Sequence, residues 1–352
     1  MSTAEVPPEE VDARERFSFG AAMRRLARGE LGSIRVLLGI AVIWTIFQIA
    51  NDRFLSAVNL SNLTLQIAAV ATISIGVVLV LLLGEIDLSV GAVSGLAASV
   101  MAVVSVKEGL APELAIVVGL LVGTAIGLFN GFMVTAFGIP SFVVTLAGLL
   151  GWQGAQLAVL GDTGSINLPP SIITDLTGTF FDPAVGWGLA VAAITAYAMS
   201  QLARGRTRAA AGLPSEPTLV VGIRTTLMAV ATLAAVAILN EDRGVPLAAL
   251  IVVVLVVIFT FITERTRYGR HIYAVGGNEE AARRAGIRVN RIKISVFALA
   301  STLAAAGGVL AASRLLAVNQ QSGSGDVLLL AIAAAVIGGT SLFGGRGFVW
   351  SA

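Results

Sequence analysis

The chain has 352 residues, of which 56% are hydrophobic and only 12% are charged, and its mean hydropathy is +0.90. Because a soluble domain usually carries about a quarter charged residues, this composition excludes an ordinary water-soluble protein. The net charge of +2 is too small to indicate nucleic-acid binding. The sequence contains no Cys, which excludes disulfides and thiolate metal sites, and its single His argues against a histidine metal centre.

The first 33 residues are rich in charge and lack the small-residue cleavage site of a signal peptide. We interpret residues 1–33 as a cytosolic tail and residues 34–352 as a transmembrane domain. Ten apolar runs in that domain are predicted to be helices, because about 20 apolar residues in a helix span roughly 30 Å of hydrocarbon. The runs cover residues 34–50, 65–83, 88–106, 114–136, 141–160, 184–202, 219–239, 246–262, 294–312 and 327–340. The expected fold class is all-α, a polytopic transmembrane helical bundle of about ten spans.

The basic residues indicate the orientation of the bundle, because Lys and Arg in short loops stay on the cytoplasmic side. If the N-terminus is cytosolic and every run crosses once, 19 of the 23 basic residues fall inside. Only Arg53, Lys107, Arg243 and Arg314 then fall outside. One span more or fewer would scramble this asymmetry, so it supports both the cytosolic N-terminus and the number of spans.

The stretch GEIDLSVG, residues 84–91, places two carboxylates and two glycines between the second and third runs. We expect it at the cytosolic boundary, where insertion avoids most of the roughly 2.5–3.5 kcal/mol cost of a charge at the bilayer centre. In one interpretation Asp87 caps the third helix and Glu85 faces the interface. In the other, the break lies beside a path through the bundle, or under a partner, and moves. The residues concerned are Gly84, Glu85, Asp87, Ser89 and Gly91.

A second stretch, Gly323-Ser-Gly-Asp326, precedes the tenth run and echoes the first. The helices that follow the two stretches cross in opposite directions in the predicted topology, which is the pattern of an inverted repeat with broken helices. Ser324 and Asp326 would then face outside. Polar residues inside the spans, namely Asn130, Gln153 and Gln156, are candidates to line a substrate path, although such residues more often join neighbouring helices.

The longest cytosolic connection, residues 264–293, predicts a surface helix of about two turns. Asn278 is the expected N-cap, acidic residues fill the first turn, Arg residues fill the last, and Gly286 suits the C-cap. Such a helix is either a solvated connector or a knob that docks into a cleft on a partner, and its small side chains would let a partner approach. The helix and its caps comprise Gly277, Asn278, Glu279, Glu280, Ala281, Ala282, Arg284 and Gly286.

The sequence lacks a Gly-x-x-x-x-Gly-Lys-[Ser/Thr] phosphate loop, a nucleophile elbow and a His-Glu-x-x-His motif. We therefore expect no catalytic residues, no cofactor or metal held by this chain, and no ATP hydrolysis by the chain alone.

Three segments together carry a resemblance to a known family: GEIDLSVGAVSGLAA, YGRHIYAVGGNEEAARRAGIRVNRIK and AIAAAVIGGTSLFGGRG. In combination they resemble the permease subunits of bacterial ribose/xylose-type ABC importers, which are sugar transporters of the plasma membrane. The likeness covers most of the chain from about Ile34. The additional pair of spans around residues 203–262 is most similar to the longer, xylose-permease-type branch.

The resemblance implies a division of labour among subunits. A cytosolic ABC ATPase would bind ATP and Mg, an extracytoplasmic binding protein would deliver a sugar such as the pentose xylose, and two permease copies would form a homodimer. By resemblance, residues 277–286 would couple the permease to the ATPase, and Ser324 and Asp326 would lie near the docked binding protein.

In similar permeases the last motif leads into further apolar sequence and at least one more span, whereas this sequence ends at Ala352. We therefore expect a C-terminal span to be missing. Two other functions stay open from the residues: a stand-alone secondary transporter, which would need an ionisable group within the spans, and a membrane scaffold without transport.

Overall fold

The computed structural model describes residues 32–213 and 218–351. The chain forms two compact units, residues 1–52 and 53–352, which we treat separately. Nearly all of the predicted tail, residues 1–33, lies outside the described residues. The described part of the first unit is helix α2 (Gly32–Ala50).

All ten apolar runs are helical, which confirms the predicted all-α polytopic bundle. In the second unit these helices are α3 (Ala57–Leu82), α4 (Val90–Ala102, continued by a π-helical turn at Val103–Lys107), α5 (Pro112–Phe137), α6 (Ser141–Leu160), α8 (Pro183–Ala210), α9 (Thr218–Asp242), α10 (Leu247–Arg265), α13 (Val289–Leu315) and α14 (Val327–Ile337). Within the described ranges, eight helices are long and apolar enough to cross a membrane. Leu38–Ala50 and α14 are shorter apolar helices.

The helix ends follow local capping chemistry. Pro112 and Pro183 stand in the first turns of α5 and α8, where the missing N–H of proline costs nothing. Helix α3 begins eight residues earlier than predicted, because Ser56 caps it by accepting a hydrogen bond from the Asn59 N–H at 3.3 Å. Residues 57–64 include several polar side chains, so this part of the helix lay outside the predicted apolar run.

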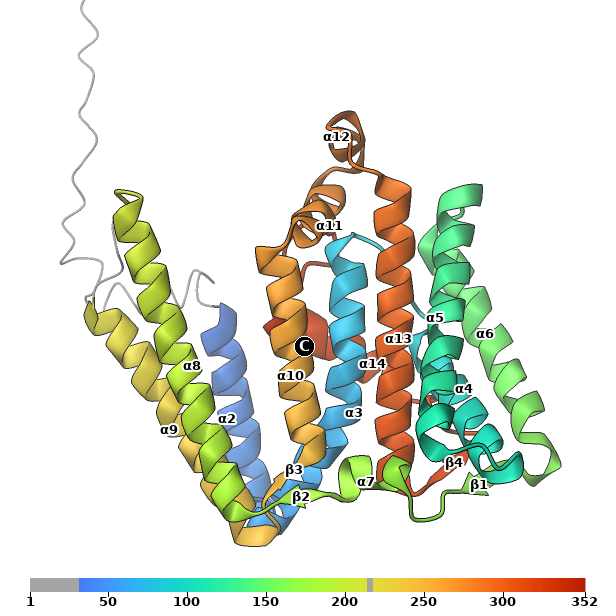
Figure 1. Cartoon of the computed structure of the whole chain (residues 1–352), viewed down its shortest axis with the longest axis horizontal. Coiled ribbons are helices and arrows are strands. Elements are labelled where there is room, and N and C mark those ends of the chain that lie inside the picture. The colour runs from blue at the N-terminus through green and yellow to red at the C-terminus, as the bar shows by residue number, and fades with distance from the viewer. Residues whose placement is uncertain (1–31, 214–217, 352) are drawn as a thin grey trace, which may run out of the picture. The chain divides into compact units, whose positions relative to one another are not determined.

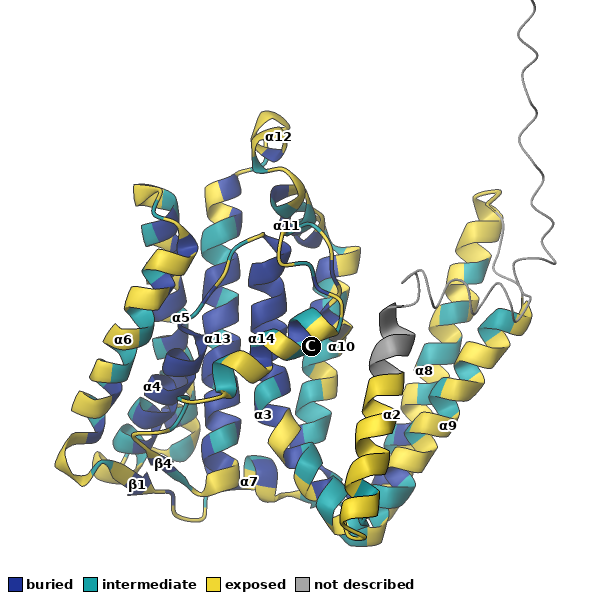
Figure 2. Cartoon of the chain, turned by 180° about the vertical axis from the view of Figure 1, so that it is seen from behind, coloured by how far each residue is buried: buried dark blue, intermediate teal, exposed yellow. Residues whose placement is uncertain are grey.

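Helices α3, α4 and α13 form the core of this unit, with α5 packed along α13. Figure 2 shows the burial concentrated on α3, α4 and α13, whereas α6, α8 and α9 are largely exposed. Gly123, Gly127 and Gly131 recur every four residues along α5 on the face that touches α13. A Cβ on Gly127 would lie 2.7 Å from the Ala298 Cα, so glycine is what allows these two backbones to approach.

Short elements close the two ends of the unit (Figure 1). At one end, β1 (Ser165–Asn167) pairs antiparallel with β4 (Ala317–Asn319), and β2 (Phe180–Phe181) pairs with β3 (Val245–Pro246); α7 (Ile172–Gly178) lies between β1 and β2 in sequence. At the other end lie α11 (Arg267–Gly277) and α12 (Glu279–Arg284). The sequence had predicted the first region only as a polar connection, because strands of two or three residues carry no detectable periodicity.

Candidate functional site

The three sequence motifs, far apart in the chain, meet at one end of α3. The Gly345 N–H donates a hydrogen bond to the Leu82 carbonyl at 2.9 Å. A Cβ on Gly276 would collide with that carbonyl, and a Cβ on Gly344 would lie 2.8 Å from the Gly84 nitrogen. We call Gly84, Gly276, Gly344 and Gly345 the glycine junction. Its members are glycines because three backbone segments touch there without room for side chains.

Helix α11 attaches the first half of the cytosolic connection to the bundle. Ile272 and Val275 are buried, the Tyr273 hydroxyl donates to the Gly347 carbonyl at 2.8 Å, and the Tyr268 hydroxyl lies 2.7 Å from Ser295 Oγ. Burial raises the pKa of the Tyr268 phenol, which therefore stays protonated at neutral pH. We did not predict this helix, although its apolar residues at i, i+4 and i+7 were a usable signal.

The predicted cytosolic helix forms as α12. At its N-terminus, Asn278 Oδ1 accepts a hydrogen bond from the Ala281 N–H at 2.9 Å. At its C-terminus the C-cap residue is Ala285, and Gly286, predicted as the C-cap, follows it with a φ of 83°. The helix has six residues, slightly less than the expected two turns. One expectation needs correction, because Ala282 is buried against this chain and offers no surface to a partner.

The outward surface of α12 carries charge. Glu280 and Arg284 form an ion pair of 3.0 Å, with exposed side-chain fractions of 64% and 79%. Ala281 and Arg283 are exposed beside them, and Arg283 forms a second ion pair of 2.8 Å with the half-buried Glu279. The structure therefore leaves a small charged surface for a partner. Its role in contacting an ATPase stays a prediction.

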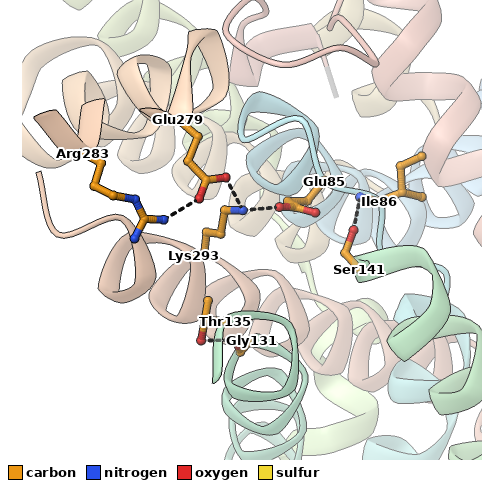
Figure 3. A network of polar contacts seen from close by, with 8 residues as sticks. All are labelled: Glu85, Ile86, Gly131, Thr135, Ser141, Glu279, Arg283 and Lys293. Carbon is orange, nitrogen blue, oxygen red and sulfur yellow. Dashed lines mark hydrogen bonds and ion pairs between the residues drawn. The ribbon is translucent and has the colours of Figure 1, made fainter. Parts of the chain in front are cut away.

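Lys293 connects α12 to the stretch between α3 and α4 (Figure 3). Its Nζ lies 2.6 Å from Glu85 Oε1 and 2.7 Å from Glu279 Oε2. The side chains of Lys293 and Glu85 are only 12% and 16% exposed. The hydrogen bond from Lys293, with added help from Arg283, holds the pKa of the Glu279 carboxyl below its usual value. The sequence interpretation missed Lys293, although it is one of only two lysines and opens a long apolar helix.

Residues 84–89 run as a non-helical segment against α6. The Ile86 N–H donates to Ser141 Oγ at 3.2 Å and the Leu88 N–H donates to Thr145 Oγ1 at 3.0 Å. Ser141 and Thr145 are one helical turn apart, so one face of α6 supplies both acceptors. Irregular backbone at membrane depth is tolerated only where protein or water covers it, and here α6 provides that cover.

Asp87 is buried within this segment, with 4% of its surface exposed. Its Oδ1 accepts hydrogen bonds from the Ser89 N–H at 2.8 Å and the Ser89 hydroxyl at 2.6 Å, and Asn130 Nδ2 donates to Ser89 Oγ at 3.1 Å. Within the described ranges, Asp87 Oδ2 and Asn130 Oδ1 have no hydrogen-bond partner. The three side chains therefore form a buried polar cluster that retains two unused acceptor atoms.

This geometry corrects two expectations. Asp87 was expected at the solvent boundary, but the segment dips into the bundle and buries it. One of the two interpretations had Asp87 cap the next helix, whereas the N-cap of α4 is Ser89, which makes no side-chain capping bond. Glu85 is half-buried and paired with Lys293, and its place at the membrane interface stays a prediction. Asn130, a candidate path residue, bonds Ser89.

The two helix breaks meet in the bundle. A Cβ on Gly91 would lie 2.6 Å from the Gly323 carbonyl oxygen, and a Cβ on Gly95 would collide with the Ser322 carbonyl. Gln156 Nε2 donates to the carbonyls of Asn319 and Ser322, both at 3.0 Å. Gln156 was predicted as a possible sugar contact, and its amide N–H groups instead bond the backbone carbonyls of the segment before α14. The reason is that the segment before α14 returns alongside α4 and needs donors for its carbonyls.

The remaining predicted residues are Gln153, Ser324 and Asp326. Gln153 is half-buried on α6 and makes no hydrogen bond in the described part of the chain. Ser324 Oγ donates to the Gln321 carbonyl at 2.7 Å, and Asp326 is exposed as the N-cap of α14. Next to them a cavity of 190 Å³ opens between α3, α4 and α13, with Gln66, Ser94 and Gln321 among its lining residues. Their roles toward a sugar or a binding protein stay predictions.

Comparison with known proteins places the chain in a family. Residues 59–345 match the family described as branched-chain amino acid transport system / permease component. The chain is 38% identical to the xylose transport system permease protein XylH of Escherichia coli (strain K12), over 87% of this chain and 76% of that protein. It is 34% identical to XylH of Haemophilus influenzae (90% and 84%) and 30% identical to the ribose import permease protein RbsC of Bacillus subtilis (99% and 85%). No solved structure matches the chain.

These matches cover most of the chain and confirm the resemblance drawn from the three motifs. With eight apolar helices long enough to cross a bilayer in the described ranges, the protein is a multi-pass protein of the bacterial inner membrane. A permease component forms the membrane part of a transport system and is not itself an enzyme. The chain therefore belongs to this family of transport-system permease components and is of the ribose/xylose ABC permease type.

Proposed function

We propose that this chain forms the membrane path of an ATP-driven importer for a pentose such as xylose. A separate cytosolic ATPase hydrolyses ATP, an extracytoplasmic binding protein delivers the sugar, and two copies of the permease work together. The similarity to xylose and ribose permeases supports the substrate class. ATP and Mg would be held by the ATPase.

The observation that carries this proposal is the connection of α12 to the helix break through Lys293. The Lys293 ammonium lies 2.7 Å from the Glu279 carboxylate on α12 and 2.6 Å from the Glu85 carboxylate at the start of the break. The glycine junction joins the end of α11, directly before α12, to the start of the break through backbone contacts. A movement of α12 by an ATPase would therefore pull on residues 84–89, since short ion pairs and packed backbones do not stretch.

Movement of residues 84–89 could change access to a substrate path through the bundle. Residues 84–89 contact α6 through Ser141 and Thr145, and α4 then continues to the second break at Gly323. The 190 Å³ cavity lies on that outer side and presents amide and hydroxyl groups that suit a sugar. In this mechanism the sugar enters there while the path is open outward, and ATP-driven movement of α12 rearranges the breaks to open it inward.

The test is reconstitution of the permease with an ABC ATPase and a pentose-binding protein from the same organism. We expect ATP hydrolysis to rise when the binding protein carries its pentose, and labelled pentose to accumulate in the vesicles. Glu280→Arg, on the exposed face of α12, should abolish association with the ATPase while leaving membrane insertion intact. Lys293→Met should keep association but lose the sugar-dependent rise, because it cuts the link to the break. If Glu280→Arg still associates with the ATPase and Lys293→Met still shows the sugar-dependent rise in ATP hydrolysis, the proposal is wrong.

A second candidate is favoured by one observation, the buried Asp87. A stand-alone secondary transporter needs an ionisable group among its spans, and Asp87 is such a group with an oxygen that has no partner in the described ranges. Uptake by vesicles that hold the permease alone, driven by a proton or sodium gradient and abolished by Asp87→Asn, would favour this candidate. Absence of such uptake, together with sugar-dependent ATP hydrolysis in the full complex, would exclude it.

A further inference from the structure

A basic cavity of 720 Å³ lies between α8, α9 and α10, at the ends of these helices that face the cytosol in the predicted topology. Four guanidinium groups line it: Arg204 and Arg208 from α8, Arg224 from α9 and Arg265 from α10. Glu264 is the single carboxylate among the lining residues. Among the lining residues, cationic charge thus exceeds anionic charge by three.

Two of the four arginines have no ion-pair partner in the described part of the chain. Arg204 and Arg265 are exposed and make no hydrogen bond or ion pair with any described residue. A guanidinium group presents its donors as a planar fork that matches the paired oxygens of a phosphate. The side chains of Ser200, Gln201 and Thr207 add neutral hydrogen-bonding groups to the same wall. The chemistry of the cavity therefore favours a phosphate group.

Apolar side chains begin directly beneath these arginines. Phe261 is one turn before Arg265 on α10, Leu227 is one turn after Arg224 on α9, and Met199 precedes the lining residues on α8. All three are more than 60% exposed. They lie on the membrane side of the basic ends, where acyl chains would cover them. A ligand that fits both parts has a phosphate at the cytosolic surface and hydrocarbon below it.

We propose that the basic cavity binds the phosphate of an anionic phospholipid from the cytosolic leaflet, whose acyl chains lie along α8, α9 and α10. Basic pockets between transmembrane helices on the cytoplasmic side are a recurring form of lipid site, and each arginine near an anionic surface strengthens attraction. The lipid joins the α8–α9 hairpin to α10 by supplying one anion to arginines on separate helices. Soluble phosphate shares the head-group chemistry but leaves the apolar walls uncovered.

The experiment measures lipid selectivity with the full-length protein. Protein from nanodiscs containing equal amounts of phosphatidylglycerol and phosphatidylcholine is analysed by native mass spectrometry, and the ratio of the two lipid adducts is read directly. Wild type should retain phosphatidylglycerol preferentially. The double variant Arg204→Gln/Arg265→Gln should weaken phosphatidylglycerol binding about 30-fold, the effect of two charges at the usual strength of surface arginines.

The matched control is Arg267→Gln/Arg270→Gln, which removes two exposed arginines from α11, outside the cavity, for the same change in net charge. It should leave the lipid ratio unchanged. Excess inorganic phosphate should not displace the lipid. An equal loss in the control, or no preference in wild type, would overturn the proposal, and displacement by inorganic phosphate would assign the site to a soluble anion. If the double variant fails to insert, the two single variants each report a smaller loss.

Discussion

Lys293 is a single side chain that forms ion pairs with two carboxylates from different parts of the chain. It contacts Glu85, before the break, and Glu279, on α12, at 2.6 and 2.7 Å. Lys293 and Glu85 are largely shielded from water, so their interaction is screened less than that of an exposed pair. Removing one partner of such a pair leaves the other charge without compensation, which costs more than the pair itself contributes.

Replacing Lys293 by Met keeps most of the length of the side chain and removes its charge. We expect the free energy of unfolding to fall by about 3 kcal/mol, because Glu85 is left shielded and unpaired. Arg284→Gln is the control on α12, where the pair with Glu280 is exposed and should contribute less than about 0.5 kcal/mol. The measurement is thermal unfolding in detergent, and equal shifts for both variants would show that Lys293 has no special role.

Glu279 should make the anchoring of α12 sensitive to acid. Its pKa is lowered by the hydrogen bond from Lys293, with Arg283 also facing it. A lowered folded-state pKa means that the stabilisation is complete above the ordinary Glu value of about 4.3 and is lost as the pH falls through the lowered value. The difference in unfolding temperature between wild type and Glu279→Gln should therefore be constant near pH 7 and shrink only below about pH 4. A difference that disappears near pH 6 would contradict this assignment.

At the scale of elements, three short backbone segments are held together by the glycine junction. Gly276, in the last turn of α11, lies against the last turn of α3, and Gly344 and Gly345 contact both helix ends. The junction makes the cytosolic connection and the C-terminal segment one packed unit with α3. Close packing of this kind moves as a body, which is what coupling to a partner requires.

Two neighbouring glycines offer a matched test. Gly276→Ala would place a Cβ against the Leu82 carbonyl and 2.8 Å from the Gly345 nitrogen, and backbone atoms cannot step aside. We expect destabilisation of about 3 kcal/mol, at the upper end of typical overpacking. Gly277→Ala meets nothing within 4 Å and should be neutral or slightly stabilising. Thermal unfolding of both variants decides the point, and similar stabilities would show that the junction is loose.

At the scale of the whole molecule, the short elements at the two ends of the second unit should lie on opposite sides of the membrane. The basic ends of the spans and α12 lie at one end, and the two small sheets with α7 lie at the other. This agrees with the positive-inside asymmetry of the sequence.

The chain contains no Cys, so one introduced thiol reports its side without background. Ala285→Cys, just after α12, should react with a membrane-impermeant maleimide only in inside-out vesicles. Asp162→Cys, near the outer end of α6, should react only in intact spheroplasts. Both positions are exposed, so failure to react would reflect the membrane and not burial. Reaction of both thiols from the same side would contradict the topology.

Local features of the sequence were enough to predict the helices and the N-cap of α12, and they also predict an orientation that the labelling experiment above tests. These properties depend on local quantities: the length of an apolar run, the side on which Arg and Lys collect, and the side chain at a cap. The family also followed from motifs that can be read in the printed sequence. The helix α11 was within reach, since its apolar residues repeat at helical spacing, and the boundary of α3 was missed because polar residues begin that helix.

The contacts between these residues, in contrast, are set by the tertiary structure. Asp87 belongs in a buried cluster with Ser89 and Asn130, Lys293 links α12 to the break, and Gln156 supports backbone. Such contacts join residues tens to hundreds of positions apart, and their geometry is set by how the helices pack. A local pattern carries no information on that packing, so the same carboxylate in GEIDLSVG was compatible with a solvent-facing cap until the fold buried it.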